Sequence, residues 1–105
     1  DAYLNVVGGI RIDDPASDLA ICASLLSSRM EKEIPAHMIL LGEVGLSGEV
    51  RSVPYLEMRL KEAAKLGFKK AIVPKMREKI SGLKNLEIQE VRSVKEALRA
   101  LSESH

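Results

Sequence analysis

The sequence has very few cysteine and aromatic residues, and each shortage excludes a class of protein. Its one cysteine, Cys22, cannot form a disulfide or a cysteine-based zinc site within the chain. Its aromatic residues are Tyr3, Tyr55 and Phe68 only, which argues against the base-stacking surface typical of single-strand binders. The core must therefore be built from aliphatic side chains.

Excess charge and long apolar runs are lacking as well. The net charge of +1 gives no global basic field to attract nucleic acid, so a nucleic-acid surface would have to be local. No apolar run approaches the roughly 18 residues that a membrane helix needs, and the first residues lack the pattern of a signal peptide. Together with the single cysteine, these features fit a reducing cytoplasm and no membrane partner.

The 105 residues are enough for one domain, which we expect to span 1–105. The apolar share of 46% and the charged share of 30% are typical of a globular domain. Spacing of apolar residues predicts an α+β fold with helices packed on a mixed β-sheet. The expected helices follow Asp14, Pro54 and Ser93, and the expected strands lie within 2–12, 36–53, 69–74 and 86–91. The first strand carries a break at Gly8 and Gly9.

Two stretches suggest ligand sites but have simpler interpretations. The glycine-rich run GEVGLSGEV, residues 42–50, lacks the Lys and Ser/Thr of a phosphate loop and is typical of a hairpin turn. The carboxylates Asp13, Asp14 and Asp18 lie at the start of a helix, where acidic residues are ordinary caps, so no metal site is predicted.

Three motifs carry a resemblance to a known family. They are NVVGG, GEVGLSGEVRSV and EAAKLGFKKAIVP. With the segment DPASDLAICASLLSS, they resemble the Lon-protease-like domain at the C-terminus of the bacterial RadA (Sms) family of DNA repair and recombination proteins. The resemblance covers the chain from Tyr3 to about Leu101. It implies the α+β architecture of ribosomal protein S5 domain 2, with the first strands of that domain preceding Asp1.

The resemblance also identifies the positions of a catalytic dyad. Lon peptidases use a serine in a turn before a helix and a lysine in a later helix. In this sequence Ala16 stands at the serine position and Arg59 at the lysine position. Alanine has no nucleophile, and arginine stays protonated near neutral pH, so we expect no peptidase activity. A Ser-Lys peptidase remains the alternative.

Two neighbouring residues bear on the same positions. Ser17 lies about 100° around the helix from Ala16, which predicts a capping or solvent-facing group. Asp18 and Arg59 are predicted to form an ion pair where the active site would have been.

For the full-length protein the resemblance implies a DNA-dependent ATPase that drives branch migration in homologous recombination. It implies ATP, Mg²⁺ and Zn²⁺ in other domains, since no Walker motif and no cysteine pair occur in this chain. The implied partners are single-stranded or branched DNA, further copies in a hexameric ring, a recombinase and a replicative helicase. The implied location is the bacterial cytoplasm.

Two roles for the domain itself remain open. One is assembly through an apolar patch, to which Tyr55, Met58 and Leu83 could contribute. The other is DNA binding through a basic stripe, in which phosphate contacts would be independent of sequence. A solvated, mixed-charge face is the alternative for these cations. The stripe would comprise Lys69, Lys70, Lys75, Arg77 and Lys79, with Arg51, Arg11 and Lys84 as possible additions.

Overall fold

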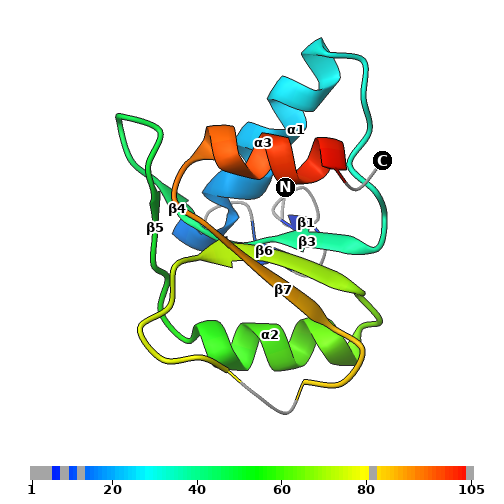
Figure 1. Cartoon of the computed structure of the whole chain (residues 1–105), viewed down its shortest axis with the longest axis vertical. Helices are drawn as coiled ribbons and strands as arrows, with labels where there is room; N and C mark the ends of the chain where they lie inside the picture. The colour runs from blue at the N-terminus through cyan, green and yellow to red at the C-terminus, as the bar shows by residue number, and fades with distance from the viewer. Residues whose placement is uncertain (1–5, 8–9, 12–13, 81–82, 104–105) are drawn as a thin grey trace.

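The computed structural model describes residues 6–7, 10–11, 14–80 and 83–103. A parallel three-stranded sheet forms the centre of the molecule, in the order β3 (Met38–Leu40), β6 (Lys70–Pro74), β7 (Glu87–Val91). Ile39 pairs with Ala71, and Ala71 pairs with Ile88. Figure 1 shows that the three strands start at the same end of the sheet.

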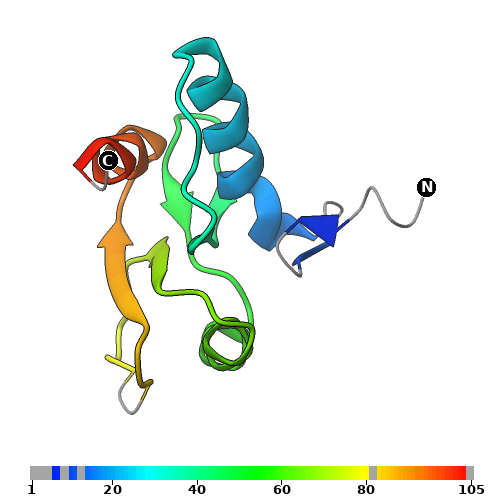
Figure 2. The same ribbon diagram turned by 90° about the vertical axis from the view of Figure 1, so that its right-hand side faces the viewer.

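Three helices cover the two faces of this sheet. Helix α2 (Leu56–Lys65) lies on one face, while α1 (Asp18–Arg29) and α3 (Val94–Glu103) lie on the other, as Figure 2 shows. The strand residues alternate between the two cores. Met38, Leu40 and Ile72 pack with α1 and α3, whereas Ile39, Ala71 and Val73 pack with α2. β3 and most of β6 are continuous apolar runs because both of their faces are buried, whereas β7 mixes polar and apolar residues.

Two antiparallel pairs complete the described strands. β1 (Val6–Val7) pairs with β2 (Ile10–Arg11), and β4 (Glu43–Val44) pairs with β5 (Val50–Arg51). The expected break at Gly8 and Gly9 lies outside the described residues. The glycine-rich run is the turn between β4 and β5, with Gly48 at a φ of 81°. The predicted α+β class, with parallel and antiparallel pairings, is confirmed.

Local signals set the helix ends. Asp14 caps a short 3₁₀ helix η2 (Pro15–Ser17), which leads into α1, so the predicted single helix from Pro15 has a tighter first turn. Gly67 ends α2 at a φ of 94°, a conformation that favours glycine. Ser93 Oγ accepts a 3.1 Å hydrogen bond from the backbone N–H of Glu96 at the start of α3.

Candidate functional site

The entrance to α1 carries Ala16, the residue that the resemblance aligns with the serine of the Lon dyad. Ala16 and Ser17 are both buried, at 0% and 1% exposure. The Ser17 hydroxyl donates a 2.7 Å hydrogen bond to the backbone carbonyl of Asp14. Ser17 is therefore not solvent-facing, because the 3₁₀ turn folds its side chain back onto the preceding residue.

Backbone hydrogen bonds join the entrance of α1 to Gly42, which lies between β3 and β4. The Gly42 N–H donates to the Ala16 carbonyl at 2.9 Å, and the Leu19 N–H donates to the Gly42 carbonyl at 2.9 Å. A Cβ on Gly42 would lie 2.8 Å from Val50 Cγ1, so a side chain there has no room. Glycine at position 42 thus allows the close approach that fixes Ala16.

Arg59, at the position of the lysine, extends from α2 toward the same entrance. Its Nη1 lies 2.9 Å from Asp14 Oδ2, and its Nε donates to the Pro54 carbonyl at 2.8 Å. Asp18 instead accepts a hydrogen bond from the Val44 N–H at 3.2 Å. The predicted Asp18–Arg59 pair is therefore replaced by Asp14–Arg59, because Asp18 faces the β4 backbone. The sequence predicts only a capping role for Asp14, whereas in the structure Asp14 both caps the turn and pairs with Arg59.

Two groups stabilise the ionised carboxylate of Asp14. The backbone N–H of Ala16 donates to Oδ1 at 3.0 Å, and the Arg59 guanidinium sits against Oδ2. The Ala16 hydrogen bond first, and then Arg59, lower the pKa of Asp14 below its ordinary value, with burial opposing them. An ionised carboxylate thus lies beside the guanidinium at the former base position, which favours an ion pair over proton transfer.

The predicted basic stripe does not form one continuous surface. The buried strand β6 separates the cations before it from the cations after it. Its residues Ala71, Ile72, Val73 and Pro74 are all buried. Lys69 and Lys75 stand at opposite ends of this strand, roughly 20 Å apart at about 3.3 Å per residue. The cations therefore form two groups, one at each end of the central strand β6.

Carboxylates offset several of these cations. Glu90 on β7 faces Lys79 and lies 4.0 Å from Lys75, while Lys70 lies 3.8 Å from Glu87. The hydrogen bond from Lys79, and then the Met76 N–H, lower the pKa of Glu90. This arrangement follows from the register of β7, which places Val91 opposite Pro74. For these cations the mixed-charge alternative describes the surface better.

Arg51 has a carboxylate partner as well. Its Nη2 lies 2.7 Å from Glu49 Oε2 on the same hairpin. Its hydrogen bond to Glu49 lowers the pKa of Glu49 and raises the pKa of Arg51. The side chain of Arg11 lies outside the described residues. In the described part of the chain, Lys69 and Arg77 have no ion pair, and neither does Lys84, one of the possible additions to the stripe.

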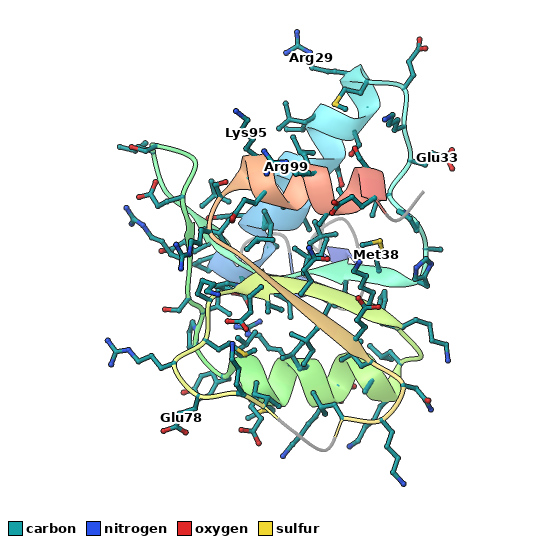
Figure 3. All side chains as sticks on the ribbon, viewed as in Figure 1. Arg29, Glu33, Met38, Glu78, Lys95 and Arg99 are labelled. Carbon is teal, nitrogen blue, oxygen red and sulfur yellow. The ribbon has the colours of Figure 1, made fainter. Side chains whose placement is uncertain are left out.

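The structure adds cations that sequence reasoning did not single out. Lys95 and Arg99 lie one turn apart on α3, and Figure 3 shows Lys95 and Arg29, at the end of α1, pointing away from the molecule. All three are exposed, and none has an ion pair among residues 14–80 and 83–103. Their i, i+4 spacing on α3 was the signal available in the sequence.

The predicted apolar patch is only partly present. Tyr55, the residue just before α2, is 72% exposed, and Met58 in the first turn of α2 is 64% exposed. Leu83 is half-buried and packs against the core beneath α2. The expectation that Leu83 contributes to an exposed patch is therefore wrong, because the chain before β7 folds it inward.

Within the described residues no group of three His, Cys, Asp or Glu side chains is arranged to hold a metal ion. None of the described helices has the length and apolar character required to cross a membrane.

Comparison with known proteins identifies the family. The sequence profile of a family described as subunit ChlI of Mg-chelatase matches residues 4–77, which is well over half of the chain. The chain belongs to this family.

Curated proteins that resemble the chain share one name. The chain is 46% identical over 102 residues to the DNA repair protein RadA of Aquifex aeolicus, a match that covers 96% of this chain and 22% of that protein. It is 47% identical over 103 residues to RadA of Pseudomonas aeruginosa, covering 98% of this chain and 23% of that protein. It is 57% identical over 75 residues to RadA of Synechocystis, covering 71% and 15%. The resemblance indicated by the motifs is thus confirmed, and the chain spans about a fifth of the length of these relatives.

Proposed function

We propose that this domain is a proteolytically inactive, Lon-like scaffold that contacts DNA within a DNA repair protein. The observation that carries the first part is the state of the two dyad positions. Ala16 is buried and lacks a nucleophilic atom, and Arg59 is bound to Asp14 and to the Pro54 carbonyl. A Ser-Lys mechanism needs a neutral amine beside a hydroxyl, and neither group is present at these positions.

Ser17 is a poor substitute for the missing nucleophile. Its hydroxyl donates to the Asp14 carbonyl, and its side chain is 1% exposed. Arg59, the cation that pairs with Asp14 in this turn, retains its proton at neutral pH. The alternative function, a Ser-Lys peptidase, therefore has little support.

The role in DNA repair is supported by the relatives, which are named DNA repair protein RadA. For the longer protein we propose a DNA-dependent ATPase active in branch migration, assembled as a hexameric ring in the bacterial cytoplasm. We further propose a recombinase and a replicative helicase as its partners. We propose, from the resemblance alone, that ATP, Mg²⁺ and Zn²⁺ bind to other domains of that longer protein.

Contact with DNA is supported by exposed cations on several elements. Lys69, Arg77, Lys95 and Arg99 are exposed and carry no ion pair within residues 14–80 and 83–103. Contacts from such groups would be made to phosphate, so they would weaken with salt and be indifferent to sequence. Assembly is the second role, and the exposed side chains of Tyr55 and Met58 favour it.

Sedimentation velocity of the chain over a concentration series, with and without a single-stranded oligonucleotide, tests these roles together. We expect a complex with the oligonucleotide that dissociates as salt is raised from about 50 to about 200 mM. A discrete ring-sized species without DNA would assign assembly to this domain. A chain that neither binds DNA nor associates would contradict both roles, and cleavage of an unfolded protein substrate would contradict the scaffold.

A further inference from the structure

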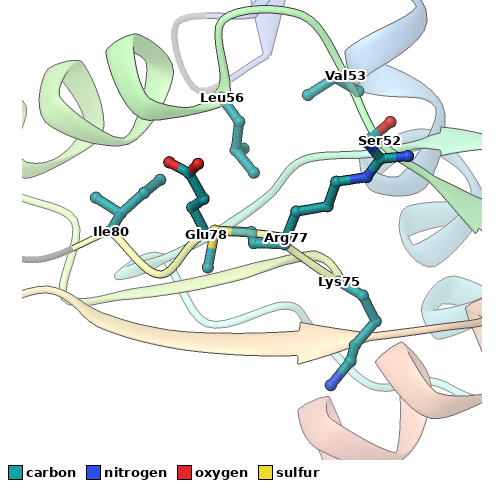
Figure 4. Close-up of a pocket in the computed structure, with 8 residues that line it drawn as sticks. Ser52, Val53, Leu56, Lys75, Arg77, Glu78 and Ile80 are labelled. Carbon is teal, nitrogen blue, oxygen red and sulfur yellow. The ribbon is translucent and has the colours of Figure 1, made fainter.

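A surface groove of about 300 Å³ lies at the carboxyl end of β6 (Figure 4). Val53, Leu56, Met76 and Ile80 give it an apolar lining, and Lys75, Arg77 and Glu78 contribute charged side chains. In open α/β sheets, ligands bind beyond the carboxyl ends of the parallel strands. The groove occupies such a position and combines apolar surface with cations.

Tyr55 lies in the chain between Val53 and Leu56, which both line this groove. The side chain is 72% exposed. Its backbone has a φ of 60° and a ψ of 35°, the left-handed conformation that non-glycine residues avoid. Strained residues persist only where the surrounding structure holds them, and they cluster at functional sites.

Arg59 holds this strained turn in place. Its side-chain Nε donates to the carbonyl of Pro54 at 2.8 Å, and its backbone N–H donates to the carbonyl of Tyr55 at 3.0 Å. The guanidinium is itself fixed by Asp14 at 2.9 Å. The residue at the former base position thus clamps the turn that presents an aromatic ring to solvent.

Arg77 is the cation of the groove that remains available. Lys75 faces Glu90 at 4.0 Å, whereas Arg77 is exposed and has no ion pair in the described part of the chain. Figure 4 shows its side chain extended toward Ser52 along the edge of the groove. A guanidinium in this position matches the geometry of a phosphate group.

We propose that Tyr55 and Arg77 form a subsite for one nucleotide of single-stranded nucleic acid. The base stacks on the Tyr55 ring beside the apolar groove, and the adjoining phosphate pairs with Arg77. This inference rests on the proposed contact with DNA and assigns it a place. An extended stacking platform needs several aromatic residues, but a single-nucleotide subsite needs only one ring.

Replacement of Tyr55 by glycine separates stacking from folding. Tyr55→Gly removes the ring while supplying the residue that best accepts a positive φ, so stability should be kept or raised. Affinity for an oligo-dT probe, measured by fluorescence anisotropy, should nevertheless fall at least about fivefold. Tyr55→Phe should bind like the wild type, and so should Met58→Ala, which truncates the exposed neighbour on the same helix.

A second probe distinguishes base from backbone contacts. Binding of an abasic oligonucleotide should be indifferent to Tyr55→Gly but weakened by Arg77→Gln, because only phosphate contacts remain. If the chain binds oligo-dT and Tyr55→Gly binds as tightly, the subsite is wrong while the proposed function stands. If the wild-type chain binds neither probe, both fail. If Tyr55→Gly alters only self-association in sedimentation, this surface is a protein interface and the subsite is again wrong.

Discussion

Arg59 makes polar contacts with Asp14 at the entrance of α1 and with Pro54 in the turn before α2. Its side chain is 22% exposed, and its guanidinium joins α2 to the entrance of α1 through Asp14. Arg59→Ala would remove the ion pair with Asp14, whose carboxylate would keep only the Ala16 N–H, and the hydrogen bond to the Pro54 carbonyl. Hydrogen bonds to charged groups contribute about 1.5–3 kcal/mol each, so we expect the free energy of unfolding to fall by about 2 kcal/mol in urea denaturation.

The matched control for this change is Lys61→Ala on the same helix. Lys61 pairs with Glu57 at 3.1 Å, but both side chains are more than half exposed. Exposed i, i+4 pairs contribute about 0.3–0.5 kcal/mol. Equal losses for the two variants would mean that the Asp14–Arg59 pair is no stronger than an ordinary surface pair.

The charge of Asp14 makes the stability of the folded chain depend on pH in the acid range. Because its pKa is lowered from 3.8 in the folded state, its stabilising effect is complete above that value and is lost as the pH falls through the folded pKa. We expect Asp14→Asn to be less stable than the wild type at neutral pH, with a difference that shrinks below about pH 3.8. Urea midpoints measured across this range check it. A difference that stays constant with pH would show that the charge of Asp14 contributes nothing.

At the scale of elements, the start of α3 offers a direct test of capping. Ser93 Oγ accepts from the Glu96 N–H, while the Glu96 carboxylate accepts from the Arg92 N–H at 2.8 Å. Ser93→Ala should destabilise the chain by about 1 kcal/mol, measured by thermal or urea unfolding. Ser28→Ala, on the exposed side of α1, serves as the control and should change stability little.

Helix and strand positions were predictable wherever a local signal exists. Short-range signals visible in the sequence include the N-cap at Asp14, the capping box of Ser93 and Glu96, and the helix end at Gly67. In a standard capping box the Glu96 carboxylate would accept from the backbone N–H of Ser93. Here it accepts from the N–H of Arg92, one residue earlier, a difference that side-chain rotamers decide. The Arg59–Asp14 pair joins residues that are 45 positions apart, so no local pattern could select Asp14 over Asp18.

At the scale of the whole molecule, the cations of the predicted stripe lie in two separate groups, so reversing a charge in one group should affect DNA binding differently from reversing a charge in the other. Lys69 and Arg77 lie beyond opposite ends of β6 and have no ion pairs in the described part of the chain. If the subsite beside Arg77 binds DNA, Arg77→Glu should weaken oligonucleotide binding more than Lys69→Glu does, and the difference should fade with salt. Equal effects in anisotropy titrations would indicate a diffuse electrostatic attraction.

This separation could not be read from the sequence. The five cations from Lys69 to Lys79 are neighbours along the chain, yet the intervening strand is buried at the centre of the sheet. The position of Glu90 opposite Lys75 and Lys79 depends on the register of β6 and β7, which apolar patterns leave undetermined. The α+β class follows from patterning, whereas surface electrostatics follow from long-range pairing.

The strand order also has a consequence for how the chain acquires its structure. β6, the middle strand, comes after β3 and α2 in the chain, so β3 has no neighbour in the parallel sheet until residues 70–74 are present. Parallel pairing across such long connections is slow relative to helix formation. During synthesis, β3 and the apolar face of α2 would remain exposed to solvent until β6 emerges from the ribosome. The interval between these two segments is therefore when this domain is most open to chaperones and to aggregation.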